Sequence, residues 1–146
     1  MKYIFIIIIT YNILQACNLE PKLNNELKIQ NISKAKIIIR ESNNDSLSNK
    51  YVFDYFQALF STPVSDIYYI NPNTTGTYTI IGEWKDRFTM TTDSIIRFYF
   101  FNYDSVIYTD LKLDSNLIKR TLIKKMKFKL SDFERMNWVI TFAGEK

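Results

Sequence analysis

Blocks of apolar and polar residues follow one another along the chain, and the spacing inside each block predicts its secondary structure. Residues 3–14 are apolar almost throughout, whereas residues 18–34 are polar and asparagine-rich, with single apolar residues and no sustained period. Residues 35–40 form a compact β-branched run that predicts a strand. Residues 41–49 are dense in turn-forming side chains and predict a loop.

Residues 51–60 have the spacing of an amphipathic helix. Val52, Phe56 and Leu59 recur at helical intervals, so their shared apolar stripe is expected to face the core. Pro63 follows closely and predicts that the helix ends before it.

Beyond this helix the period changes to two, which predicts strands separated by short polar breaks. The predicted strands are residues 66–71, 77–83, 87–91, 95–101, 105–113, 123–130 and 138–142. Residues 95–101 are apolar on both faces around the single charged side chain of Arg97, which predicts a central strand covered on both sides. Residues 117–126 also fit a basic amphipathic helix, but a loop or short helical turn followed by the strand at 123–130 is our preferred interpretation.

Residues 131–134 have the pattern of a helix capping box. The Ser131 hydroxyl and the Glu134 carboxylate stand at the spacing at which each can accept a hydrogen bond from the other's backbone amide, which predicts a short helix to about residue 137. Together these elements predict a single α+β domain over residues 35–146. We expect an antiparallel meander sheet of about six strands, one packed helix and a short capped C-terminal helix.

The first apolar block has the layout of a secretory signal. Lys2 supplies one positive charge, a short apolar core follows, and the small residue Ala16 stands directly before Cys17. A permanent membrane-spanning helix needs about 20 apolar residues, more than this core contains. Residues 1–16 are therefore predicted to be a cleaved signal, and residues 17–34 a flexible tether to the domain.

The sequence Leu14-Gln15-Ala16-Cys17 resembles the lipobox of bacterial lipoproteins, in which a Leu lies three residues before the Cys and a small residue directly before it. The resemblance implies that Cys17 receives a diacylglycerol, that signal peptidase II cuts before it, and that the new amino terminus is acylated. It also implies a lipid-anchored place in the bacterial cell envelope. Asn18 rather than Asp follows the cysteine, which is compatible with the outer-membrane sorting that the resemblance implies.

Cysteine content agrees with lipidation. Cys17 is the only cysteine among 146 residues, so it has no disulfide partner within the chain. An ordinary cleaved signal that leaves a free thiol at this position is the alternative.

Composition removes several classes of catalytic site. The chain has no histidine and one cysteine, which excludes Ser-His-Asp and Cys-His mechanisms and makes a zinc site unexpected. No phosphate-binding glycine loop occurs, and we expect no cofactor and no metal. The acids that could serve a carboxylate-dependent enzyme are Glu83, Asp86, Asp104, Asp110 and Asp114. They stand at predicted turns or alternate outward on predicted strands, where solvated side chains are the ordinary interpretation.

Charge gives one candidate contact surface. Removal of residues 1–16 takes away one lysine and leaves 18 Lys and Arg against 15 Asp and Glu, a net charge of about +3 that is too mild to predict nucleic-acid binding. Basic residues gather over 119–129, and Lys124, Lys125 and Lys127 form a possible contact patch for anionic lipid headgroups or an acidic partner. The alternative is a solvated strand face whose lysines discourage edge pairing.

Two short motifs resemble known patterns. Gly82-Glu83-Trp84 resembles the Gly-x-Trp signature of lipocalin-like barrels, in which the Trp closes one end of the barrel. The dipeptides Asp45-Ser46, Asp93-Ser94 and Asp104-Ser105, each followed by an apolar residue, resemble a bacterial O-glycosylation sequon. The same dipeptides also fit plain turn chemistry.

The sequence thus predicts a noncatalytic, lipid-anchored envelope protein that acts as a binding or interaction module. Its expected partners are the membrane, through the lipid on Cys17, and an envelope protein or glycan. Two alternatives stay open: an immunity or inhibitor lipoprotein against a protein toxin, and a carboxylate-dependent enzyme acting on envelope polysaccharide.

Overall fold

The computed structural model describes residues 25–61, 69–107 and 116–144, and these residues fold into a mixture of helices and strands. The strands are β1 (Glu26–Asn31), β2 (Ile37–Ser42), β3 (Tyr69–Ile70), β4 (Thr74–Thr79), β5 (Ile96–Asn102), β6 (Leu122–Phe128) and β7 (Val139–Phe142). The helices are α2 (Asn49–Ser61), α3 (Trp84–Thr89), α4 (Tyr103–Ile107), α5 (Leu117–Thr121) and α6 (Leu130–Arg135). The α+β class predicted from the sequence is confirmed.

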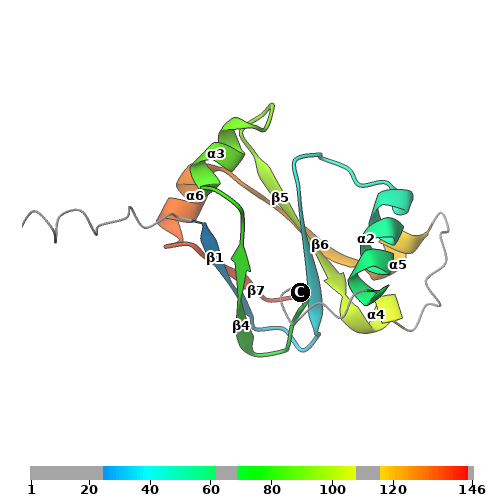
Figure 1. Cartoon of the computed structure of the whole chain (residues 1–146). Helices are drawn as coiled ribbons and strands as arrows, with labels where there is room; N and C mark the ends of the chain where they lie inside the picture. Colours follow the sequence, from blue (N-terminus) through cyan, green and yellow to red (C-terminus); the bar gives the residue numbers. More distant parts are fainter. Residues whose placement is uncertain (1–24, 62–68, 108–115, 145–146) are drawn as a thin grey trace, which may run out of the picture.

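The strands form two sheets, so the prediction of a single meander sheet is wrong. One sheet is antiparallel with the order β3-β2-β5-β6, and the other has the order β4-β1-β7. In the second sheet β1 is antiparallel to β4 but parallel to β7, which lies beside it in Figure 1. The strands do not form a single meander, because β1 pairs with β7, the last strand of the domain, rather than with the strands that are its neighbours in sequence.

Strand β1 comes from residues that the sequence analysis assigned to the tether. Its side chains alternate strictly, with Leu27, Ile29 and Asn31 buried and the residues between them exposed. The Asn31 amide nitrogen donates to the backbone oxygens of Ala35 and Ile70, at 2.8 and 3.1 Å. The folded domain therefore begins upstream of residue 35.

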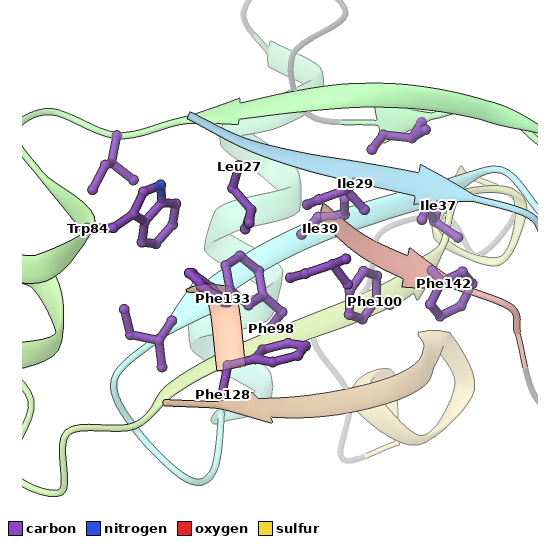
Figure 2. Packing of buried hydrophobic residues seen from close by; sticks show 14 of the residues in the cluster. Leu27, Ile29, Ile37, Ile39, Trp84, Phe98, Phe100, Phe128, Phe133 and Phe142 are labelled. Atoms are coloured by element: carbon purple, nitrogen blue, oxygen red, sulfur yellow. The ribbon is translucent and has the colours of Figure 1, made fainter. Parts of the chain in front are cut away.

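The central strand predicted from its two apolar faces is confirmed as β5, and each face contributes to a separate core. Phe98 and Phe100 point between the two sheets, where they meet Leu27 and Ile29 from β1 (Figure 2). The opposite face of β5 packs against α2, α4 and α5, which cover one side of the four-stranded sheet (Figure 1). The four-stranded sheet is thus covered by the other sheet on one face and by helices on the opposite face, which explains why β5 has no solvated face.

Helix α2 is the helix predicted at residues 51–60. Val52 and Phe56 are buried against the sheet, as their spacing predicted. The Ser48 hydroxyl caps the helix by accepting a hydrogen bond from the Tyr51 backbone amide at 3.1 Å. The Tyr55 hydroxyl donates to the Ile39 carbonyl at 3.0 Å, which ties the helix to β2.

Helices α3 and α6 close one end of the space between the sheets (Figure 1). Residues 87–91 were predicted to be a strand, but α3 forms here because Trp84 and Phe88 lie one helical turn apart and both enter the core. The Trp84 of the Gly-x-Trp motif is therefore buried on a helix (Figure 2).

The predicted capped C-terminal helix is confirmed as α6, but it begins earlier than the capping pattern indicated. The Asp132 carboxylate accepts a hydrogen bond from the Lys129 backbone amide at 2.8 Å, so the cap lies at Lys129 rather than at Ser131. The predicted strand at 123–130, preceded by a helical turn, is confirmed as β6 after α5. The predicted strand at 105–113 is wrong where the structure describes it, because Tyr103–Ile107 are helical.

Candidate ligand-binding pocket

The lysines of the predicted contact patch lie on β6 but do not share one face. Lys125 and Lys127 point toward the helix-covered side of the sheet, and Lys124 points to the other side. The Lys125 and Lys127 ammonium nitrogens lie 3.1 and 2.6 Å from the Oδ1 atom of Asp45. Two of the three cations are thus paired within the chain, and contact of the patch with lipid or a partner stays a prediction.

Of the other residues singled out in the sequence, some lie outside the described residues and others are exposed on short helices. Cys17, Asp110 and Asp114 lie outside the described residues. Asp86 is exposed on α3, and Asp104 is exposed on α4.

The Asp-Ser pairs of loops 43–48 and 92–95 have a structural role through their carboxylates. Asp45 and Asp93 both bind the guanidinium of Arg97, which is itself buried. Asp93 also accepts a hydrogen bond from the Ile95 backbone amide at 3.1 Å, the turn chemistry that such a dipeptide predicts. Glycosylation of the exposed residues Ser46 and Ser94 stays a prediction.

A pocket of about 580 Å³ lies beside the C-terminal half of β2, between α2 on one side and β4 and α3 on the other. Its charged and aromatic lining residues are Arg40, Glu41, Tyr51, Tyr78 and Arg87. Its neutral polar lining residues are Ser42, Asn43, Asn44, Ser46 and Ser48. A pocket of this size, with a few convergent polar groups, fits a small ligand.

Glu41 is the unusual side chain of this pocket. Strand β2 alternates, so Glu41 points to the same face as Ile37 and Ile39, and only 7% of its side chain is exposed. Within the described residues its one ion pair is with Arg87, at 3.7 Å between Oε2 and Nη2, and its carboxylate has no hydrogen bond. Burial raises the pKa of Glu41 above its usual value, although the charges of Arg87 and Arg40 oppose the shift.

Arg87, the ion-pair partner of Glu41, has a hydrogen-bond donor that is not used by any described residue. Its side chain is 41% exposed, yet its Nε atom is buried and lacks a hydrogen-bond partner among the described residues. The Tyr78 hydroxyl lies in the same corner, and burial together with the Glu41 charge raises the pKa of Tyr78 to about 12. This corner therefore holds a carboxylate and a guanidinium whose hydrogen-bonding capacity is largely unused.

On the α2 side of the pocket, Arg40 contacts two tyrosine side chains and holds them in place. The Arg40 Nε atom donates to the Tyr51 hydroxyl at 3.0 Å, and the guanidinium carbon lies 4.7 Å from the centre of the Tyr55 ring. This arrangement holds Tyr51 at the rim of the pocket with 39% of the residue exposed. The contact with the Tyr55 ring restricts the Arg40 side chain, and the hydrogen bond from Arg40 restricts the Tyr51 side chain.

A second cavity of similar volume, about 590 Å³, lies near the end of β7, but its charged lining residues differ in burial from those of the first pocket. Its charged lining residues, Lys34 and Arg120, are both exposed. It contains no buried charged side chain, so the pocket at Glu41 is the better candidate site.

Comparison of the sequence with protein-family models and curated proteins, and of the fold with solved structures, found no match. Among the described helices none combines the length and apolar character needed to cross a membrane. The same residues contain no group of three or more His, Cys, Asp and Glu side chains that could hold a metal ion.

This pocket was not predicted from the sequence, although one signal was present. Glu41 was assigned to the start of a polar loop, whereas the alternation of residues 37–42 puts it on the same face as two isoleucines. A carboxylate on the apolar face of a strand is a recognisable candidate. Nothing in the sequence places Arg87 or Tyr78 beside it, because that contact depends on how α3 and β4 pack.

Replacement of Glu41 by Gln is expected to stabilise the fold near pH 8. A buried carboxylate whose folded-state pKa is raised loses stability as the pH rises through that pKa, and the neutral amide avoids this loss. The difference from wild type should shrink toward pH 4, where Glu41 is largely protonated even in the unfolded chain. Urea unfolding at both pH values measures it. Glu134→Gln, at an exposed position of α6, is the matched control, and a Glu41→Gln protein less stable than wild type at pH 8 would contradict the prediction.

Proposed function

We propose that the protein is a noncatalytic binding module of the bacterial cell envelope, anchored by lipid on Cys17, with the pocket around Glu41 and Arg87 as its ligand site. One observation supports this above all others: the Glu41 carboxylate, which has no hydrogen bond among the described residues, and the partly exposed guanidinium of Arg87 line the same pocket. Groups of this kind reduce stability when they stay unsatisfied, so their presence favours a ligand that completes them.

The lining of the pocket favours binding over hydrolysis. Glu41 is the one carboxylate among the described residues that line it. Glycoside hydrolysis commonly uses two carboxyl groups that flank the scissile bond. A single buried acid next to two arginines is better suited to recognising polar groups than to acid–base chemistry.

The place of the first strand limits how far the pocket can lie from a lipid on Cys17. Strand β1 begins at Glu26, so residues 18–25 would join the lipidated residue to the folded domain. Eight residues span at most roughly 28 Å when fully extended. The proposed anchor therefore keeps the domain near the membrane surface, where envelope components are its available ligands.

The proposal is tested by one experiment with two arms, the first of which concerns the anchor. Wild type and Cys17→Ala are expressed in a bacterial host supplied with a clickable fatty acid. Wild type is expected to be labelled and to sediment with the outer membrane, whereas the variant should carry no label. Because Cys17 is the only cysteine, a labelled variant would contradict lipidation at this residue.

The second arm concerns the pocket. Purified protein is mixed separately with three fractions of the host envelope: peptidoglycan fragments, lipopolysaccharide, and dialysed periplasmic small molecules. At least one fraction is expected to raise the melting temperature of wild type, since a ligand that binds only the folded state stabilises it. The double variant Glu41→Gln/Arg87→Met should lose this rise, whereas Arg135→Met, at an exposed site on α6, should keep it. If no fraction stabilises wild type, the pocket is not an envelope-ligand site.

A further inference from the structure

The charges that line the pocket define which class of ligand it can accept. Glu41 is negative when ionised, and Arg40 and Arg87 are positive. An anionic ligand would meet the buried carboxylate, and a cationic ligand would meet two guanidinium groups. A neutral ligand that both donates and accepts hydrogen bonds avoids both conflicts.

The distance between the two unsatisfied groups points to hydroxyl groups in particular. The Glu41 Oε2 and Arg87 Nη2 atoms are 3.7 Å apart, too far for a good direct hydrogen bond. A hydroxyl group can donate to the carboxylate while it or a neighbouring hydroxyl accepts from the partly exposed Arg87 guanidinium. Adjacent ring hydroxyls of a sugar present this pattern.

The rim of the pocket supplies an aromatic surface for such a ring. Tyr51 is exposed at the edge, and its hydroxyl is held by Arg40. The face of an aromatic ring is electrostatically negative and attracts the weakly positive C–H hydrogens of a sugar ring.

The loop over residues 43–48 is held in place by two side chains that are not among the lining residues of the pocket. Arg97 donates to the Asn43 carbonyl at 3.1 Å, and the Tyr99 hydroxyl donates to the Asn44 carbonyl at 3.0 Å. Both asparagines also line the pocket. Their amide groups are thus on a backbone that is already ordered, which reduces the entropy lost on binding.

The free edge of β2 is closed to an added peptide strand. Beyond Ile38 this edge has no partner strand among the described residues. The Tyr55 hydroxyl, however, occupies the Ile39 carbonyl on that side. Strand addition requires such backbone groups to be available, so a peptide bound in this way is disfavoured.

We infer that the pocket binds a neutral saccharide, whose hydroxyl groups join the Glu41 carboxylate to the Arg87 guanidinium and whose ring lies against Tyr51. The inference rests on the proposed function, because it names the ligand class of the same site.

The experiment uses purified protein on an array of neutral, acidic and amino-bearing glycans, followed by calorimetric titration of the glycans that bind. Neutral glycans are expected to dominate. In a matched series, glucose-terminated glycans should bind more tightly than their glucuronate or glucosamine counterparts. Glu41→Gln and Tyr51→Ala should each weaken binding about tenfold or more, equivalent to about 1.4 kcal/mol. The control Glu134→Gln should bind as wild type does.

Other results would overturn the inference in different ways. Tighter binding of glucuronate glycans, especially if Glu41→Gln strengthens it, would identify an anion site. Absence of glycan binding, with stabilisation by an envelope fraction that depends on Glu41 and Arg87, would refute the saccharide and leave the proposed function standing. Absence of both glycan binding and stabilisation by an envelope fraction would refute the saccharide and the proposed function together. Unfolding of Glu41→Gln cannot imitate a loss of binding, because its folded fraction is measured by urea titration in the same buffer.

Discussion

Replacement of Phe133 by Ala is expected to lower the free energy of unfolding by about 3–5 kcal/mol, a large share of the stability of a domain of this size. Phe133 on α6 is fully buried, and its ring packs against five other aromatic rings at centroid distances of 5.3–6.1 Å. These rings come from α3, β5, β6 and the segment before β7. The cavity left by alanine would therefore loosen the end of the domain where the two short helices meet both sheets.

Urea unfolding measures this loss, and two other variants set its scale. Phe133→Leu should cost less than Phe133→Ala, because it leaves a smaller cavity. Met90→Ala, at a position 74% exposed beside the same helix α3, should change stability by no more than about 0.5 kcal/mol. A cost below about 1 kcal/mol for Phe133→Ala would mean that the six rings do not form one packed unit.

Replacement of Arg97 by Met should lower the free energy of unfolding by about 2–3 kcal/mol, because several charge-assisted hydrogen bonds are lost together. Arg97 is buried in β5, and its guanidinium contacts the carboxylates of Asp45 and Asp93 and the carbonyls of Asn43 and Ile95. Methionine fills part of the space but leaves these acceptors without their donor. The partly exposed carboxylates can turn to water, so the cost stays below that of a fully buried ion pair.

The same substitution should change how stability depends on pH. The pKa of Asp93 is lowered mainly by Arg97, and the pKa of Asp45 is lowered by Lys127 first and then by Arg97. A carboxyl group with a lowered folded-state pKa contributes stability above its unfolded pKa of about 3.9, and the contribution is lost as the pH falls below it. Wild type should thus lose stability steeply below about pH 4, and Arg97→Met less steeply.

Thermal unfolding between pH 2.5 and pH 7 distinguishes these slopes. Arg135→Met removes an exposed cation that is paired with Asp132 and serves as the control. Its pH profile should follow that of wild type. Parallel profiles for wild type and Arg97→Met would show that Arg97 does not stabilise the ionised carboxylates.

The sequence predicted those elements whose pattern is local and strong. Residues 51–60 form a helix because their apolar stripe needs only one surface to pack on, and the two apolar faces of β5 correctly indicated a covered central strand. The strand at β6 was also predicted correctly against a helical alternative. In each case the period over seven or more residues was sufficient.

The sequence did not predict the features that depend on distant partners. Strand β1 has only two apolar inward residues, Leu27 and Ile29, which looked like scattered apolar residues in a polar stretch. In α3 the aromatic and β-branched residues led to the prediction of a strand. The segment forms a helix because a helix buries Trp84 and Phe88 on one side. For the candidate site, alternation could place Glu41 on an apolar face, but Arg87 and Tyr78 reach it only through the packing of α3 and β4.

The parallel pairing of β1 with β7 also sets an order of events in folding. Lys28 in β1 is paired with Val139, 111 positions further along the chain, so β1 cannot be completed as a central strand until β7 has been made. A loop this long makes closure slow relative to local helices and hairpins. During synthesis the three-stranded sheet would therefore form last, and the inner core would stay open until then.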